Sequence, residues 1–257
     1  MRCEEELCRA FDVARLRCLS ALHARDGGIG TLGEKTLHRI LKYTFEPDDT
    51  CHEVSVLGSV ADIRNAEGIV EIQTRSFEHL VPKLEKFLPE SRTTVVYPLP
   101  NEKILHTLDL TTGEVGKGRK SPKKCKVYDA FWEIYKIRRF LSHPNFRLVL
   151  LFLDVDEYRK KTSRRRHGSE RVERIPKHLA GAFHLASPED YGRVFLPATL
   201  PDSFTVQDYA RATGVRTRYA SLGVAILSSL GLLCRDGKAG RAYLYRRTSL
   251  PENRTHP

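Results

Sequence analysis

Two acids and one amide stand among apolar residues in the stretch from Val60 to Thr74. Asp62 is followed nine positions later by Glu71, and Gln73 lies two positions further on. β-branched residues flank the turn-forming run Asn65-Ala66-Glu67-Gly68, which predicts a β-hairpin. Side chains alternate along strands, so Glu71 and Gln73 share a face, and antiparallel pairing brings Asp62 near Glu71. Two desolvated carboxylates repel each other, so a bound cation or a shared proton would stabilise the pair.

The pattern D-x8-E-x-Q resembles the metal-binding core of the PD-(D/E)xK nuclease superfamily, which has the restriction-endonuclease-like fold. In that family an Asp ends one strand, (D/E)-x-K lies on the next, and the two acids hold Mg²⁺ that activates water against a phosphodiester. The resemblance implies that Asp62 and Glu71 are catalytic metal ligands for Mg²⁺, with Mn²⁺ able to substitute. Gln73 takes the catalytic position where the family usually has lysine, so the charge of that lysine is missing.

The elements around the hairpin are expected in the order of this nuclease core. An amphipathic helix from Glu4 to His23 leads the chain, and a second helix opens at Thr31. Crossing back from the hairpin strand to a parallel neighbour needs a helix. We expect a strand before the hairpin, the crossover helix after it and then the parallel strand, at His52 to Leu57, Ser76 to Leu88 and Thr93 to Leu99.

Glu34 is a further candidate catalytic residue. Many members of the nuclease superfamily carry an additional acid on the helix before the hairpin, and the resemblance maps that acid onto Glu34. The alternative is that Glu34 only completes a capping box with Thr31, three residues earlier. The sequence favours neither interpretation over the other.

Later elements are expected to complete an α/β domain that ends near Tyr158. The remaining elements are a strand, an amphipathic helix whose aromatic residues belong to the core, and a buried strand, at Lys103 to Leu110, Val127 to Leu141 and Arg147 to Val155. Asp154, Asp156 and Glu157 could form a competing acidic site, although such acids are more often a solvated strand end. A basic connector with one short helix near Ile175 to Ala182 is expected to follow.

The C-terminal part changes pattern to two helices and two strands. Helices are predicted over Phe204 to Ala212 and Arg216 to Leu230, with strands on both sides of Gly237 to Gly240. This arrangement resembles a winged helix-turn-helix domain, in which the second helix enters the major groove and the wing touches the DNA backbone. The resemblance implies DNA contacts by side chains of the second helix and the wing: Arg216, Thr217, Arg218, Tyr219, Ser221, Lys238 and Arg241.

The expected layout is thus an α/β protein with a restriction-endonuclease-like mixed sheet flanked by helices and a small α+β winged-helix domain. Similar uncharacterised bacterial proteins join a nuclease-like core to a C-terminal winged helix. The expected divisions are an N-terminal helix, the nuclease-like domain, the basic connector, the winged helix-turn-helix domain and a tail, at residues 1–27, 28–158, 159–200, 201–248 and 249–257.

Charge points to a polyanionic partner. The 257-residue chain has a formal net charge of +11, and the runs Gly116 to Lys126 and Arg159 to Arg166 contain no acid. The sequence has no signal-peptide pattern and no apolar run of membrane-spanning length, so a cytoplasmic, nucleoid-associated protein without a membrane partner is expected. Six dispersed cysteines without a C-x-x-C pair are expected to be free thiols.

Two functions follow from these patterns. The leading expectation is a Mg²⁺-dependent DNA endonuclease, and a homodimer would let one site per chain cut both strands. The alternative is a DNA-binding transcriptional regulator whose nuclease fold has lost catalysis, which the glutamine at position 73 motivates. A metal-free interaction scaffold with incidental basicity is the third interpretation.

Overall fold

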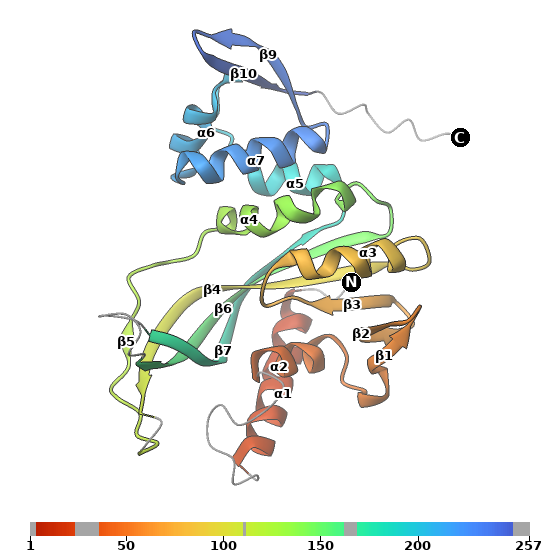
Figure 1. Ribbon diagram of the computed structural model, residues 1–257, viewed down its shortest axis with the longest axis vertical. Helices are drawn as coiled ribbons and strands as arrows, with labels where there is room; N and C mark the ends of the chain where they lie inside the picture. The colour runs from red at the N-terminus through yellow and green to blue at the C-terminus, as the bar shows by residue number, and fades with distance from the viewer. Residues whose placement is uncertain (1–3, 24–35, 110–111, 162–168, 249–257) are drawn as a thin grey trace. The chain divides into compact units, whose positions relative to one another are not determined.

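The chain divides into two compact units, seen in the computed structural model in Figure 1. The structure describes residues 4–23, 36–109, 112–161 and 169–248. The first unit comprises Met1–Thr74, Thr93–Cys125 and Val149–Phe183. The second unit comprises Arg75–Arg92, Lys126–Leu148 and His184–Pro257.

The first unit is built on a seven-stranded mixed sheet. Its strands are β1 (His52–Val56), β2 (Ser59–Asn65), β3 (Gly68–Ile72), β4 (Thr93–Leu108), β5 (Arg119–Lys120), β6 (Phe146–Lys161) and β7 (Ser169–Leu185). The strand order is β1-β2-β3-β4-β6-β7, and β5 pairs with β4. β1 pairs with β2 and β2 with β3 in the antiparallel sense, whereas β3 and β4 are parallel. The predicted hairpin and the predicted parallel neighbour are therefore confirmed.

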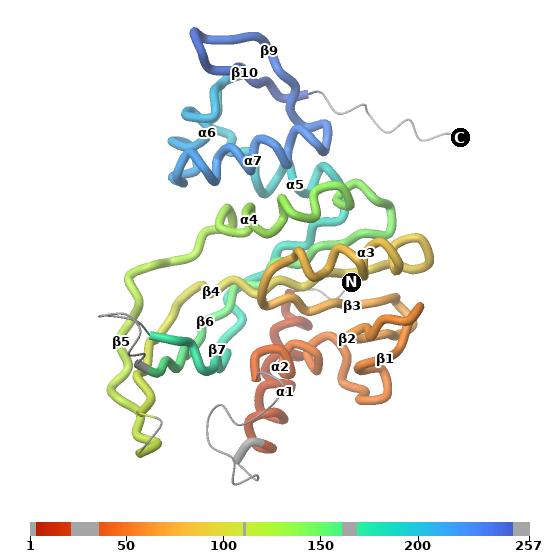
Figure 2. The backbone as a smooth tube through the Cα atoms, in the orientation of Figure 1, coloured from red at the N-terminus to blue at the C-terminus, as the bar shows by residue number. Residues whose placement is uncertain are grey.

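Two helices form the core of this unit with the sheet, and Figure 2 traces their path. They are α1 (Glu4–His23) and α2 (Thr36–Phe45). The apolar stripe of α1 recurs every three or four residues, and its members Leu7, Phe11 and Ala14 are buried. They pack with Ile63 and Ile72 of the hairpin, which lie in the same apolar cluster. This packing holds α2 against the sheet beside the hairpin.

Three expectations about the later strands are wrong. Residues from Lys103 onward form no separate strand, because β4 continues without a break to Leu108. The strand expected at Arg147 to Val155 is longer, because β6 continues to Lys161. The expected helix near Ile175 to Ala182 lies inside β7. Ile175, Leu179 and Ala182 have helical spacing, but Leu179 packs in the core of the sheet, because tertiary pairing overrides local spacing.

The second unit begins with short helical segments. The crossover is η2 (Phe77–Leu80) followed by α3 (Val81–Phe87), and the Ser76 side chain accepts a hydrogen bond from the Glu78 amide as an N-cap. The segment predicted as one helix, Val127 to Leu141, is helical from Val127 to Phe140, and most of it has 3-10 geometry. It comprises η3 (Val127–Ala130), α4 (Phe131–Ile134) and η4 (Tyr135–Phe140).

The C-terminal part of the second unit contains three helices and a small sheet. They are α5 (Pro188–Phe195), β8 (Ser203–Phe204), α6 (Val206–Thr213), α7 (Thr217–Ser229), β9 (Leu233–Ala239) and β10 (Ala242–Arg247). The sheet order is β8-β10-β9. The two helices and two strands predicted here are confirmed. Helix α5 was not expected, and together with β7 it occupies most of residues 159–200, so this segment is not a connector. The expected tail lies outside the described residues.

Candidate metal site and nucleic-acid interface

Asp62 on β2 and Glu71 on β3 each lie directly beyond the last residue pair of the hairpin ladder. Ile63 faces Val70, and Asn65 faces Gly68, and continuing this register by one residue would bring Asp62 opposite Glu71. The tight turn uses Gly68 at a φ of 131°, a conformation that residues with a Cβ rarely adopt. β3 also pairs with β4, so Glu71 lies on an inner strand of the sheet.

Asp62 is held by both the backbone and a histidine. Its Oδ2 accepts a hydrogen bond of 2.7 Å from the Ile72 amide, and His38 Nε2 lies 3.2 Å from the same oxygen. The Asp62 side chain is only 15% exposed. His38 belongs to α2, so the helix and the hairpin together fix the orientation of this carboxylate.

Glu71 is a charged residue in the interior of the first unit. It is 2% exposed and faces Val95 of β4 across the parallel ladder. Burying a carboxylate costs free energy unless opposite charge or hydrogen bonds compensate it. Gln73 follows directly after β3 and is half-buried, and its backbone N–H donates to the Val96 carbonyl at 2.9 Å. Gln73 therefore continues the alignment of β3 with β4.

The donor set of the hairpin suits a hard cation. Among the described residues, no three His, Cys, Asp or Glu side chains gather closely enough to hold a metal by themselves. Mg²⁺ commonly takes only one or two carboxylates and fills its shell with water and substrate phosphate, so Asp62 and Glu71 are sufficient in number. Glu34, the third predicted acid, lies outside the described residues.

His38 is a site residue that sequence reasoning missed. All ten histidines were interpreted as surface or core residues, because none has metal-ligand spacing. The contact with Asp62 depends on the packing of α2 against the hairpin. The only available signal was the position of His38 on the polar side of the stripe formed by Leu37, Ile40 and Leu41, which are buried.

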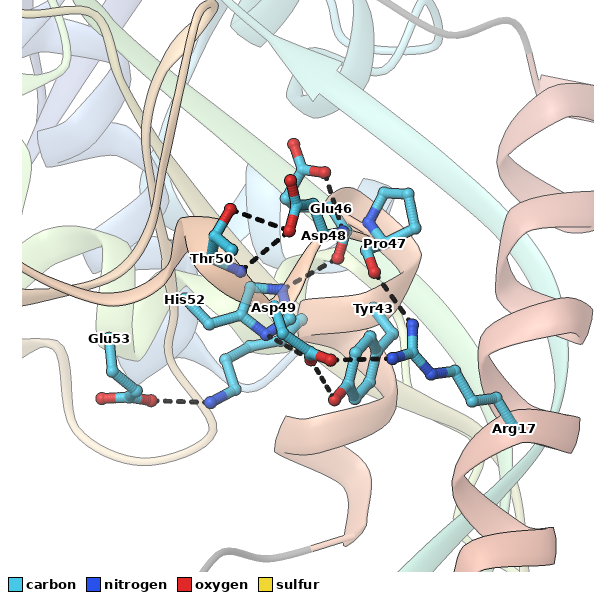
Figure 3. A network of polar contacts seen from close by, with 10 residues as sticks. Arg17, Tyr43, Glu46, Pro47, Asp48, Asp49, Thr50, His52 and Glu53 are labelled. Carbon is cyan, nitrogen blue, oxygen red and sulfur yellow. Dashed lines mark hydrogen bonds and ion pairs between the residues drawn. The ribbon is translucent and has the colours of Figure 1, made fainter.

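A second group of acids, between α2 and β1, has a structural role (Figure 3). Asp49 accepts hydrogen bonds from Arg17 of α1 at 2.9 Å and from Tyr43 of α2. Glu53 pairs with the buried Lys42 at 2.7 Å. These bonds tie both helices to the start of β1 and so support the hairpin from outside.

The acids on β6 are also partnered and do not form the competing site. Asp154 accepts from the Asn101 side chain at 2.8 Å, and Asp156 lies 3.2 Å from His106. Glu157 is fully buried between Arg159 at 2.6 Å and Arg174 at 3.1 Å. They are not a strand end, because β6 continues beyond them.

The pKa of Glu157 reflects that arrangement. Burial would raise its pKa, but the hydrogen bond from Arg159 and the charge of Arg174 outweigh burial and hold the pKa below its usual value. Glu157 is therefore a structural carboxylate that stays ionised at neutral pH.

Helices α6 and α7 form a well-defined helix-turn-helix. Thr205 caps α6, and Gly214 ends it in a left-handed conformation at a φ of 63°. Lys126 Nζ donates to the carbonyls of Thr213 and Gly214, each at 3.2 Å. Ala220, Leu227 and Leu230 are buried, as expected for the inward face of α7.

The predicted DNA contacts of α7 fall into two groups. Arg216, Thr217 and Ser221 are exposed. Arg218 is exposed too, but its guanidinium lies 4.2 Å from the ring centre of Trp132. Tyr219 is half-buried, with its ring 6.4 Å from Trp132. Trp132 was expected in the core, yet it is 37% exposed, so it supports this end of α7 at the surface.

The hairpin of β9 and β10 carries stacked cations. Lys238 and Arg241, the predicted phosphate contacts, are both exposed. Lys238 Nζ lies 5.1 Å from the ring centre of Tyr243, and the Arg235 guanidinium lies 4.2 Å from it. Stacking on an aromatic ring restricts where a long cationic side chain points. Arg235 is thus a further cation of this hairpin, beyond the predicted contacts Lys238 and Arg241.

Comparison with known proteins gives a family for the chain. Residues 35–186 match the family described as Domain of unknown function (DUF8091). The chain belongs to this family. The DUF8091 region runs from just before α2 to just past the end of β7 and so contains His38, Asp62, Glu71 and Gln73. An uncharacterized protein of Treponema pallidum (strain Nichols) is 31% identical over 238 residues, which cover 89% of this chain and 91% of that protein. No solved structure matches the chain.

Two chemical expectations can be compared with the described residues. The five cysteines within them, Cys8, Cys18, Cys51, Cys125 and Cys234, are free thiols, as predicted. None of the helices that the structure describes has both the length and the apolar character needed to cross a membrane.

Proposed function

We propose that this protein is a Mg²⁺-dependent DNA endonuclease, with a restriction-endonuclease-like core and a C-terminal winged helix-turn-helix domain. The observation that carries the proposal is the chain order helix, three antiparallel strands, helix and parallel strand, with Asp62 on the second strand and Glu71 on the third. This order is the one implied by the resemblance to the PD-(D/E)xK superfamily. Mn²⁺ would substitute for Mg²⁺, because both prefer carboxylate and water oxygens.

Each site residue has a distinct role in this proposal. Asp62 and Glu71 would hold the ion, which when bound lowers the pKa of water and stabilises charge on the phosphate. His38 and the Ile72 amide orient Asp62 through the oxygen that they share. Gln73 would donate a hydrogen bond to the attacking water or to a phosphate oxygen, since its amide has two donors. The resemblance also assigns an assisting role to Glu34, which lies outside the described residues.

The C-terminal part would hold DNA. The succession α5, β8, α6, α7, β9, β10 supports assigning a winged helix that begins at Pro188, earlier than the sequence suggested. Arg216, Thr217 and Ser221 on the exposed side of α7 would meet the major groove. The cations of the wing, Lys238 and Arg241, would meet the backbone. Tyr219 would act mainly through its contact with Trp132.

The experiment that tests the activity is incubation of the purified full chain with plasmid DNA and with single-stranded DNA in Mg²⁺, in Mn²⁺ and in EDTA. The proposal expects cleavage in either metal and none in EDTA, while DNA is bound in all three. Absence of cleavage in both metals by protein that binds DNA would contradict it. The same assay shows which form of DNA is the substrate.

A DNA-binding regulator with an inactive nuclease fold is the second candidate. It is favoured by Gln73, which has no positive charge at the position of the family's lysine. This candidate expects salt-sensitive DNA binding that is independent of metal, with no loss of substrate in any divalent ion. In either case we propose a cytoplasmic protein associated with the nucleoid. A homodimer would be needed to cut both strands concertedly.

A further inference from the structure

A basic hollow lies in the second unit. It has a volume of about 290 Å³ and is lined by Lys136, Arg138, Arg139, Ser142 and Ser229. Three of these side chains are cations and two are hydroxyls, and no carboxylate is among the described residues that line the hollow. Cations and hydroxyls are the groups that hydrogen-bond to a phosphate group. The composition of the lining therefore suits a phosphate and disfavours a cation.

The 3-10 geometry of η4 gathers these residues. A 3-10 helix has about three residues per turn and rises about 2 Å per residue, so side chains three apart lie on one face, about 6 Å from one another. Lys136 and Arg139 are three apart in η4, which ends at Phe140, and Ser142 lies two residues beyond that end. In an α-helix Lys136 and Arg139 would be turned about 60° away from one another. The departure from α-helix is thus what forms one wall of the hollow.

The charges of the hollow are only partly compensated. Lys136 is paired with Glu133, whose two carboxylate oxygens both lie 3.0 Å away. Arg139 pairs with Glu85, but both side chains are more than half exposed. This ion pair therefore contributes little to stability, and a phosphate can replace Glu85 as the partner of Arg139 at little cost. No carboxylate of the described residues pairs with Arg138. Its guanidinium lies 4.1 Å from the Tyr135 ring centre and donates to the Tyr135 carbonyl, which fixes its direction.

We propose that this hollow binds a phosphate group, with Arg138 as its main ligand and Arg139 and Ser142 as partners. Arginine is suited to this role because its planar guanidinium donates two parallel hydrogen bonds. Ser229 is the last residue of the 13-residue helix α7, which is about 20 Å long. The hollow is thus at the opposite end of α7 from Arg216 and is separate from the predicted base contacts. The phosphate could belong to the backbone of nucleic acid or to a small phosphorylated molecule.

The test is an NMR titration of the full chain with inorganic phosphate in EDTA, which excludes metal-dependent cleavage. Saturable shifts of backbone amides in residues 135–142 are expected. Arg138→Gln should weaken phosphate binding about tenfold, the loss of a charge-assisted hydrogen bond. Ser142→Asp, a second variant at an exposed position, should weaken it as well. Arg193→Gln, an exposed arginine on α5 whose side chain is 76% exposed, is the matched control and should bind as wild type does.

Non-saturable shifts, or equal phosphate affinity in all variants, would overturn the proposal. A second arm identifies the source of the phosphate. If the ligand is nucleic acid, Arg138→Gln also weakens binding of a short oligonucleotide. The slope of log affinity against log salt concentration then falls in magnitude by about one. If oligonucleotide binding is unchanged while phosphate binding is lost, the ligand is a small phosphorylated molecule. Because no cleavage is measured, the result is independent of the proposed nuclease activity.

Discussion

At the scale of single residues, the proposed site depends on how one carboxylate is oriented. Asp62 shares its Oδ2 between the Ile72 amide and His38, and these two contacts set the direction of the carboxylate. Residues that orient a metal ligand affect metal affinity without touching the metal. His38 is therefore a positioning residue in this account, and its effect should be visible in the metal requirement.

Replacing His38 by leucine should raise the Mg²⁺ concentration needed for half-maximal cleavage by about tenfold or more. His38→Asn keeps a donor toward Asp62 and should restore most of the loss. The measurement is cleavage rate against Mg²⁺ concentration, with His79→Leu as a control at an exposed position of η2. An unchanged Mg²⁺ requirement in His38→Leu would remove His38 from the site.

Gln73 gives a second prediction at this scale. If its amide supports the attacking water, Gln73→Ala should lower the cleavage rate by about 10²-fold, the usual contribution of one positioned donor. Gln73→Lys supplies the family's charge and should keep the protein active. Single-turnover rates with DNA binding measured in parallel distinguish lost chemistry from lost affinity. Equal rates in wild type and Gln73→Ala would exclude a role for this side chain.

At the scale of elements, local patterns predicted the hairpin well and the long strands poorly. Asn65 to Gly68 is a strong turn signal between β-branched runs, so β2 and β3 followed from the sequence. The strand β7 did not follow, because its apolar residues have helical spacing and its stability comes from pairing in the sheet. The contact of His38 with Asp62 was equally invisible, since it joins residues of two elements.

The buried ion pairs of Glu157 give a prediction about β6 and β7. Because the pKa of Glu157 is lowered in the folded protein, the ionised side chain stabilises the fold at pH values above the ordinary glutamate pKa of about 4.3. This contribution is lost as the pH falls through the lowered pKa. Glu157→Gln should reduce the free energy of unfolding at pH 7 by about 2 kcal/mol, and the difference should shrink in acid.

Urea unfolding at pH 7 and at pH 3 measures this effect. Glu170→Gln is the control, because Glu170 pairs with Lys160 on the same two strands but is 62% exposed. A similar loss in both variants would mean that burial of the pair does not matter.

At the scale of the whole molecule, a net charge of +11 accompanies two separate units. The first carries the proposed metal site, and the second carries the helix-turn-helix and the basic hollow. The chain as a whole should therefore bind nucleic acid with an affinity that falls linearly with salt on logarithmic axes. The sequence predicted this general property from composition, but it did not predict that α5 begins the C-terminal fold or that Trp132 supports Arg218.

Arg216→Gln should lower the slope of log affinity against log salt by about one, if Arg216 contacts one phosphate. Fluorescence anisotropy of labelled DNA between low and moderate salt measures the slope. Arg193→Gln removes an equal charge from α5 and should leave it nearly unchanged. A slope that falls equally in both variants would indicate diffuse attraction by net charge and no defined contact by α7.

The most direct test of the central claim is single-turnover DNA cleavage in Mg²⁺ by Asp62→Asn and Glu71→Gln, each compared with wild type. Both changes nearly preserve shape and remove one ionised ligand. Loss of metal stabilisation of the transition state should lower the rate by about 10³-fold or more, with DNA binding retained. Glu67→Gln, an exposed change in the turn of the same hairpin, should cut at the wild-type rate. Cleavage by both site variants at the wild-type rate would contradict the assignment of the metal site to this hairpin.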